Sequence, residues 1–249
     1  MLARFASLWR QDDWRALLAG LVYALVYSLV SQMDWQSRLR ETRYRRRHSG
    51  LTGAVQRAGI PVARELVALT LTLGYPFLMV ILGVFSPGDL GLGMPNWGRV
   101  LAPVLVGALV ATVWLAFLWT DGIAVWRSTK ALPGERPPAL PFTVTGALLA
   151  EGHLATCRAA LMPLFGSYWG MWMGVALRML VAHTSPYTQW QLQSPVERRR
   201  VYLDWALDWV STAILASTGT VWAGLLVRVL CRTTLHLLRG RRAPAAETR

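Results

Sequence analysis

The sequence predicts an all-α fold, a polytopic bundle of about seven transmembrane helices (six to eight). Three observations predict it: 54% of the 249 residues are hydrophobic, the mean hydropathy is +0.35, and long apolar runs alternate with short basic or turn-rich segments. Soluble proteins carry a smaller apolar share. A run of about 20 apolar residues is long enough to cross a bilayer as a helix.

The first half of the chain contains three predicted spans, over residues 14–30, 64–85 and 100–120. A strongly basic segment, residues 38–57, separates the first span from the second. A loop rich in proline and glycine, residues 86–96, separates the second span from the third. Pro76 is expected to kink the second span, because proline removes a helical hydrogen bond.

Four more spans are predicted in the second half, over residues 142–158, 168–183, 202–216 and 221–238. Pro163 and Gly166 separate the first two of these, residues 185–200 are expected to form a loop, and Ser217-Thr218-Gly219 a tight turn. Residues 14–238 are thus predicted to be one transmembrane domain. Residues 1–13 are expected to lie along the interface, and residues 239–249 to form a basic tail.

The net charge of +13 is explained by topology, because the basic residues gather at the ends of apolar runs. The positive-inside rule places residues 38–57, 127–136, 198–200 and 239–242 on the cytoplasmic side. The C-terminus is therefore expected to be cytoplasmic, and the chain to reside in a bacterial cytoplasmic membrane. Membrane lipids and other integral membrane subunits are the expected partners, and nucleic acid is not.

Charged residues inside the last two predicted spans suggest ion pairs. Asp208 and Arg228 are each ten residues from Thr218, and Asp204 and Arg232 are each fourteen residues from it. Residues equidistant from a hairpin turn lie at similar depth, and residues four apart share a helix face. We expect the pairs Asp208–Arg228 and Asp204–Arg232. In the alternative, the arginines extend to the interface and the aspartates cap a helix start.

A second charged group lies in the predicted spans of residues 142–158 and 168–183. Glu151 is expected to meet Arg178 or His183 of the next span. His153 and Cys157 are four residues apart, but two ligands are too few to predict a metal site, and no cofactor is predicted.

Five further arginines are candidates for contact with lipid phosphate or with a partner. They lie inside the apolar helices and in the basic segment after the first span: Arg158, Arg178, Arg45, Arg46 and Arg47.

Residues 140–238 resemble the CAAX-processing and bacteriocin-processing (CPBP) family of intramembrane proteases. Residues 217–226, Ser-Thr-Gly-Thr-Val-Trp-Ala-Gly-Leu-Leu, are similar to the TGSLWAxIL stretch at the start of that family's last core helix. Residues 150–155, Ala-Glu-Gly-His-Leu-Ala, fall where the family carries EExxxR, and residues 179–183 fall where it carries FxxxH. The resemblance implies a helical membrane fold.

For activity, the resemblance implies a degenerate member. In the family, paired glutamates and histidines are thought to activate water for peptide cleavage. Here Ala150 stands in place of the first glutamate and Ala155 in place of the arginine. Arg228 and Arg232 stand where the last helix would carry its histidine and its Asn or Asp. An arginine does not deprotonate in proteins, so it cannot serve as a general base.

Three functions follow as hypotheses. The leading one is a non-catalytic integral membrane scaffold or accessory subunit of a larger complex, a pseudoenzyme on a CPBP-like fold. The second is an active intramembrane endopeptidase that uses Glu151 with His183 or His153. The third is a small transporter or anionic-lipid-binding protein in which Arg178 and Arg228 face the ligand.

Overall fold

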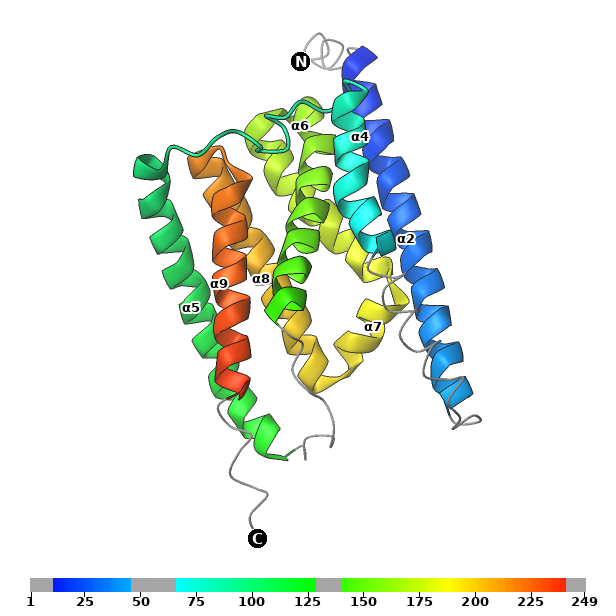
Figure 1. Cartoon of the computed structure of the whole chain (residues 1–249), viewed down its shortest axis with the longest axis vertical. Coiled ribbons are helices and arrows are strands. Elements are labelled where there is room, and N and C mark those ends of the chain that lie inside the picture. Colours follow the sequence, from blue (N-terminus) through cyan, green and yellow to red (C-terminus); the bar gives the residue numbers. More distant parts are fainter. Residues whose placement is uncertain (1–10, 46–65, 129–139, 241–249) are drawn as a thin grey trace. The chain divides into compact units, whose positions relative to one another are not determined.

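The computed structural model describes residues 11–45, 66–128 and 140–240, and every regular element in them is helical (Figure 1). The all-α prediction is confirmed for these residues. The elements are α2 (Gln11–Arg45), the π-helix η1 (Thr70–Gly74), α4 (Tyr75–Ile81), α5 (Trp97–Ser128), α6 (Leu140–Thr184), α7 (Pro186–Gln193), α8 (Pro195–Thr218) and α9 (Val221–Gly240). The predicted contacts of Arg46 and Arg47, most of the predicted interfacial segment and most of the basic tail lie outside the described residues.

One described helix, Trp14–Ser37, is long and apolar enough to cross a membrane by its length and composition, with a mean hydropathy of 1.7. Two shorter apolar helices, Leu66–Ile81 and Trp97–Val113, are also present. These helices are compatible with a membrane protein. The seven-span topology stays a prediction.

Two of the predicted breaks differ from the structure. Residues 185–200 are mostly helical, because Pro186 begins α7 and Pro195 begins α8; proline fits the first helical turn, where its missing N–H is not needed. Pro163 stays inside α6, and the break lies at Gly166 alone, at φ 76° and ψ 165°. Glycine reaches this conformation readily, whereas residues with a Cβ do not.

Pro76 is expected to kink its helix, and in the structure it follows a short π-helix. It lies in the first turn of α4, directly after the π-helix η1. Proline has no N–H to donate to the preceding turn, and a local π turn is one adjustment by which a helix accommodates such an interruption. In η1 the Thr72 hydroxyl donates to the Ala68 carbonyl over 2.6 Å.

The chain folds as two units, each built from two segments: residues 1–86 with 156–191, and residues 87–155 with 192–249. Helix α6 passes from the second unit into the first between Ala155 and Thr156. Because both units share this helix, the division does not test the predicted single domain.

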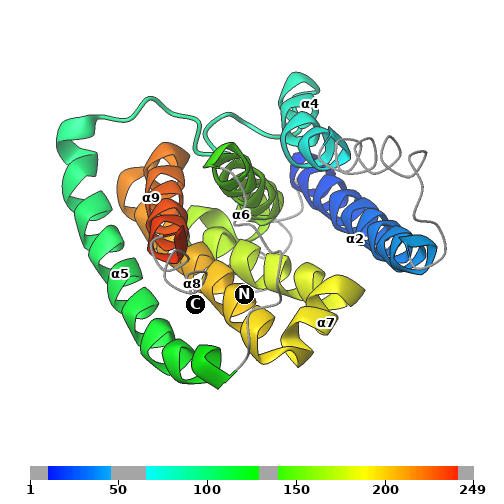
Figure 2. The same cartoon turned by 60° about the horizontal axis from the view of Figure 1, so that its bottom comes forward.

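In the first unit, α4 lies beside α2 (Figures 1 and 2). The Tyr75 hydroxyl donates to the Ala19 carbonyl over 2.6 Å, and the Tyr75 ring centroid lies 5.2 Å from that of buried Tyr23. Gly20 of α2 packs directly on Ala160 of α6, where a Cβ would overlap the alanine side chain. Small residues thus allow α2 and α6 to approach closely.

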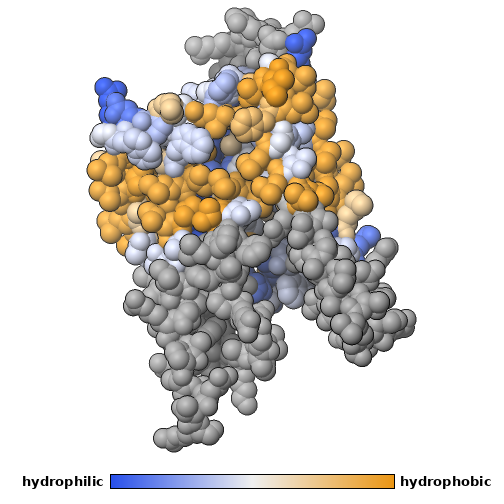
Figure 3. Space-filling view, in the orientation of Figure 1, coloured by the Kyte–Doolittle hydropathy of each residue, from blue (hydrophilic) through white to orange (hydrophobic). Residues whose placement is uncertain are grey.

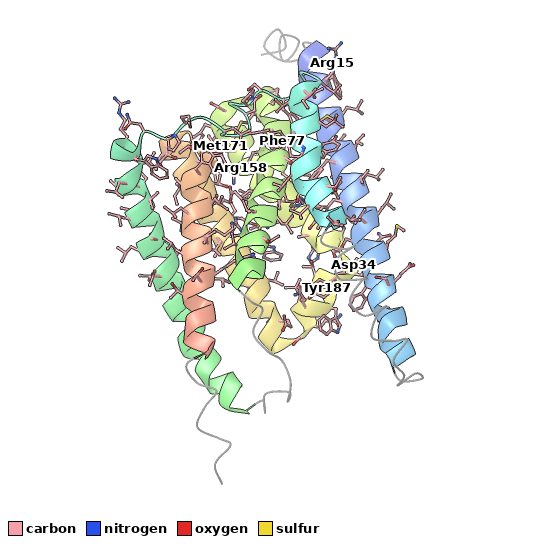
Figure 4. The ribbon with its side chains drawn as sticks, in the orientation of Figure 1. Arg15, Asp34, Phe77, Arg158, Met171 and Tyr187 are labelled. Atoms are coloured by element: carbon pink, nitrogen blue, oxygen red, sulfur yellow. The ribbon has the colours of Figure 1, made fainter. Side chains whose placement is uncertain are left out.

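Helix α7 contacts the far end of the same α2. Ser31 and Ser185 share a hydrogen bond of 2.5 Å, and the ring of Trp35 lies 6.1 Å from that of Tyr187 and 6.0 Å from that of Trp190. Figure 4 shows Tyr187 on the side of Asp34, away from Arg15. An aromatic cluster therefore joins α2 and α7.

In the second unit, α5, α8 and α9 lie side by side around one apolar core (Figures 1 and 2). The buried residues of this core come from all three helices: Val100, Val104, Ala111, Leu207, Ile214, Ala223, Val227 and Cys231. Gly107 of α5 faces Ile214, and a Cβ on this glycine would lie 2.5 Å from Ile214 Cδ1. The close fit of α5 on α8 depends on that glycine.

The turn between α8 and α9 lies where the sequence predicts it. Gly219 has φ 69° and ψ 9°, and its N–H donates to the Leu215 carbonyl over 2.7 Å. The left-handed conformation that ends α8 is one that glycine adopts at little cost. The N–H of Val221 then donates to the Gly91 carbonyl over 2.8 Å, so the loop before α5 is fastened to this turn.

Candidate functional site

The structure brings together both pairs of charged residues that the hairpin predicts. Asp204 and Asp208 lie one turn apart on α8, and Arg228 and Arg232 lie one turn apart on α9. Arg228 Nη2 is 2.6 Å from Asp208 Oδ1, and Arg232 Nη2 is 2.7 Å from Asp204 Oδ1. Each arginine donates a charge-assisted hydrogen bond to its aspartate.

The two pairs differ in burial although their chemistry is the same. The side chains of Arg228 and Asp208 are both 0% exposed, whereas those of Arg232 and Asp204 are 20% and 41% exposed. An ion pair is screened and weak in water, but a buried pair leaves an uncompensated charge when one partner is removed. The inner pair should therefore dominate the stability of the hairpin.

Glu151 of α6 is a third member of the inner pair. Arg228 Nε donates to Glu151 Oε2 over 3.2 Å, and the hydroxyl of Ser211 donates to Glu151 Oε1 over 2.7 Å. Arg228 thus lies between two buried carboxylates. The sequence suggests Arg178 or His183 as the partner of Glu151 and does not indicate Arg228, because a contact across 77 residues has no local pattern.

Two glycines allow these helices to approach closely enough for the contacts to form. A Cβ on Gly224, one turn before Arg228, would overlap the hydroxyl of Ser211. A Cβ on Gly146 would lie 2.8 Å from Arg232 Nη1. Glycine at these positions lets α9 pack against α8 and against the first part of α6, and it brings Ser211 within reach of Glu151.

We call Glu151, Asp208, Ser211 and Arg228 the ion cluster. It lies wholly within the second unit, and all four residues are buried. A charge at this depth is costly unless it is paired and hydrogen-bonded. The observed contacts supply such pairing from three helices, so the cluster ties α6, α8 and α9 together.

The two histidines of the protease hypothesis lie in different surroundings. His153 is buried on α6, two residues from Glu151. His183 is exposed near the end of α6, where its carbonyl accepts a hydrogen bond from the Gln189 amide over 3.1 Å. In the part of the chain that the structure describes, no three residues of the types His, Cys, Asp and Glu converge on a point that could hold a metal ion.

The arginines expected to contact lipid or a partner differ in burial. Arg158 is 0% exposed, so the expectation of an external contact is corrected: Gly174 allows the following part of α6 to pack on it, and a Cβ there would lie 2.8 Å from Arg158 Cγ. Arg158 belongs to α6 and is labelled in Figure 4. Arg178 is half-buried, and Arg45 is the last residue of α2.

Chemically, the cluster suits a structural role better than hydrolysis. A general base must reach the proton that it abstracts, directly or through one water. Both carboxylate oxygens of Glu151 accept hydrogen bonds, and its side chain is 4% exposed. Arg228 is likewise held by two carboxylates, which leaves it poorly placed for an incoming anion.

Comparison with known proteins gives no further constraint on this cluster. No protein-family model, no curated protein and no solved structure matches the chain.

Proposed function

We propose that this chain is a non-catalytic integral membrane protein that serves as a scaffold or accessory subunit of a larger membrane complex. The observation that carries the proposal is the position of Glu151, the main candidate for catalysis. It is buried, and its two oxygens are occupied by Arg228 and Ser211. Glu151, which would perform chemistry in a CPBP-type protease, here joins α6 to α8 and α9.

Exposed apolar side chains support the membrane part of the proposal. Leu25 of α2 is 63% exposed and Leu109 of α5 is 65% exposed. Apolar residues cover much of the described surface seen in Figure 3, including parts of α5 and α9. Contiguous apolar surface of this kind is costly in water and favourable against lipid tails or a partner.

Cysteine labelling tests the membrane location. We expect Leu25→Cys and Leu109→Cys to resist a membrane-impermeant maleimide in sealed membranes and to react after detergent solubilisation. Ser86→Cys is the control, because Ser86 is exposed in the loop after α4 and should react from its own side of the membrane. The native Cys157 and Cys231 are both buried, so the wild type gives the background. Rapid labelling of Leu25→Cys before solubilisation would exclude the membrane location.

The subunit role is tested by purification in mild detergent from native membranes through a C-terminal tag. Stoichiometric recovery with the same larger membrane assembly, in repeated preparations and at a native mass well above that of this chain, is the expected result. A lone species at every detergent concentration would contradict it.

The active protease is the alternative with a specific test. Wild type and Glu151→Gln are reconstituted and given membrane-spanning peptides. We expect no cleavage that depends on Glu151. Cleavage by wild type that is abolished in a folded Glu151→Gln protein would replace the scaffold proposal with the protease.

A further inference from the structure

An open apolar groove runs beside α9 in the second unit, with a volume of about 430 Å³. One wall is the loop before α5 and the first residue of that helix, and the other wall is α9. The lining residues from the loop side are Met94, Pro95 and Trp97, and those from α9 include Trp222, Leu226 and Val229. Among the residues that the structure describes, none that lines the groove is charged.

The α9 wall is one stripe of the helix. Trp222, Leu226 and Val229 follow the spacing i, i+4, i+7, which places them on one face. Arg228 leaves the same helix toward Asp208 and Glu151. The ion cluster therefore orients α9 so that its apolar stripe, with Trp222 41% exposed and Leu226 39% exposed, faces away from the charges.

An exposed cation follows the groove residue Trp97 in the same helical turn of α5. Arg99 is two residues after Trp97 in the first turn of α5, its side chain is exposed, and it forms no ion pair within residues 11–45, 66–128 and 140–240. Both tryptophans belong to the first turn of their helices, Trp97 in α5 and Trp222 in α9. Tryptophan at such positions commonly lies at headgroup level in membranes.

We propose that this groove binds an acyl chain of an anionic membrane phospholipid, with the lipid phosphate at Arg99. An apolar groove with an exposed cation in the same helical turn as its lining residue Trp97 suits a molecule that has an apolar tail and a negative head. The inference rests on the membrane location proposed above. The bound lipid would fill the space between α9 and the loop that is fastened to the α8–α9 turn.

The test is photocrosslinking of the full-length protein in phosphatidylcholine vesicles that contain a small share of a probe lipid. The probe carries a diazirine on its acyl chain and either a phosphatidylglycerol or a phosphatidylcholine head, and adducts are mapped by mass spectrometry. We expect adducts at residues 222–229 to be several-fold more frequent with the glycerol head. Arg99→Gln should remove this preference, and Leu226→Trp, which fills the groove, should reduce the adducts with both probes.

Matched variants control the experiment. Arg198→Gln removes another exposed arginine of the same unit, and Leu230→Trp adds the same bulk one turn further along α9, outside the residues that line the groove. Both should crosslink as the wild type does.

The outcomes separate this inference from the proposed function. Equal crosslinking along all apolar faces, unchanged by Arg99→Gln and Leu226→Trp, would overturn the groove site while leaving the membrane location intact. Adducts on the other apolar faces with none at residues 222–229 would overturn it in favour of an occupant that excludes lipid, such as a second copy or a partner protein. Absence of acyl-chain adducts anywhere would contradict the membrane location itself.

Discussion

Removal of Arg228 is the sharpest test of the ion cluster. Arg228→Met keeps an unbranched side chain but removes the guanidinium, so the buried carboxylates of Asp208 and Glu151 lose this cation. Breaking a buried ion pair by removal of one partner costs about 3–5 kcal/mol. An ordinary interhelical hydrogen bond in a membrane contributes only about 0.6 kcal/mol. The ionic contribution should therefore be clearly distinguishable from simple loss of hydrogen bonds.

Arg232→Met is the matched control, because it changes the same residue type one turn away on the same helix. Its pair with Asp204 is partly exposed, and such pairs contribute about 0–1 kcal/mol. For a chain of this size, 1 kcal/mol shifts the Tm by about 2–4 °C, which gives a loss of about 6–20 °C for Arg228→Met and about 0–4 °C for Arg232→Met.

The assay is thermal unfolding in one mild detergent, followed by circular dichroism and by tryptophan fluorescence. Salt adds a second criterion, because it screens exposed pairs more than buried ones. The small loss in Arg232→Met should shrink as salt is raised, and the large loss in Arg228→Met should not.

A mutant cycle decides whether the buried charges act together. The protein with Glu151→Gln, Asp208→Asn and Arg228→Met has no charge left in the cluster, so we expect it to be more stable than Arg228→Met alone. Losses that simply add across the cycle would refute the reasoning. Equal losses in Arg228→Met and Arg232→Met would refute it as well, since burial is the main difference between the two pairs.

Three further substitutions probe the packing around the cluster, each read as a change in Tm under the same conditions. Gly224→Ala should lose about 1–3 kcal/mol, because the new Cβ overlaps the hydroxyl of Ser211, whereas Gly93→Ala has open space around it and should be nearly neutral. Gly219→Ala should lose about 1–2 kcal/mol although no atom lies within 4 Å of the new Cβ, because φ is +69°. Ser211→Ala removes one donor to Glu151 and should lose about 0.6–1.7 kcal/mol, less than Arg228→Met. A neutral Gly224→Ala would mean that α9 does not pack this closely on α8, and a neutral Gly219→Ala would show that the turn has another conformation.

Local patterns predicted the helices well but misplaced two breaks, at Pro163 and over residues 185–200. The hydrophobic runs identified the apolar parts of α2 and α5, and Gly219 marked the end of α8, because both signals depend on neighbouring residues. Residues 185–200 were expected to be a loop because they are polar and follow an apolar run. The structure has α7 there and the start of α8, since Pro186 and Pro195 begin helices as readily as they end them.

The hairpin explains why part of the site was predictable. With one short turn at Gly219, the distance of each charged residue from the turn determines which residues face each other. Counting from Thr218 therefore paired Asp208 with Arg228 and Asp204 with Arg232. The spacing of four residues placed each pair of like charges on one helix face, and both contacts follow from these two periodicities.

By itself, the sequence determined that the described chain is helical, where the α8–α9 hairpin turns and which aspartate meets which arginine, because helical periodicity and a short turn act over few residues. Only the tertiary structure decided that Glu151 joins Arg228, that one ion pair is buried while its neighbour is partly exposed, and that Arg158 is enclosed. Those features depend on how closely segments far apart in the chain approach. That approach is set by glycines such as Gly224 and Gly174, whose effect appears only when their neighbours in space are known.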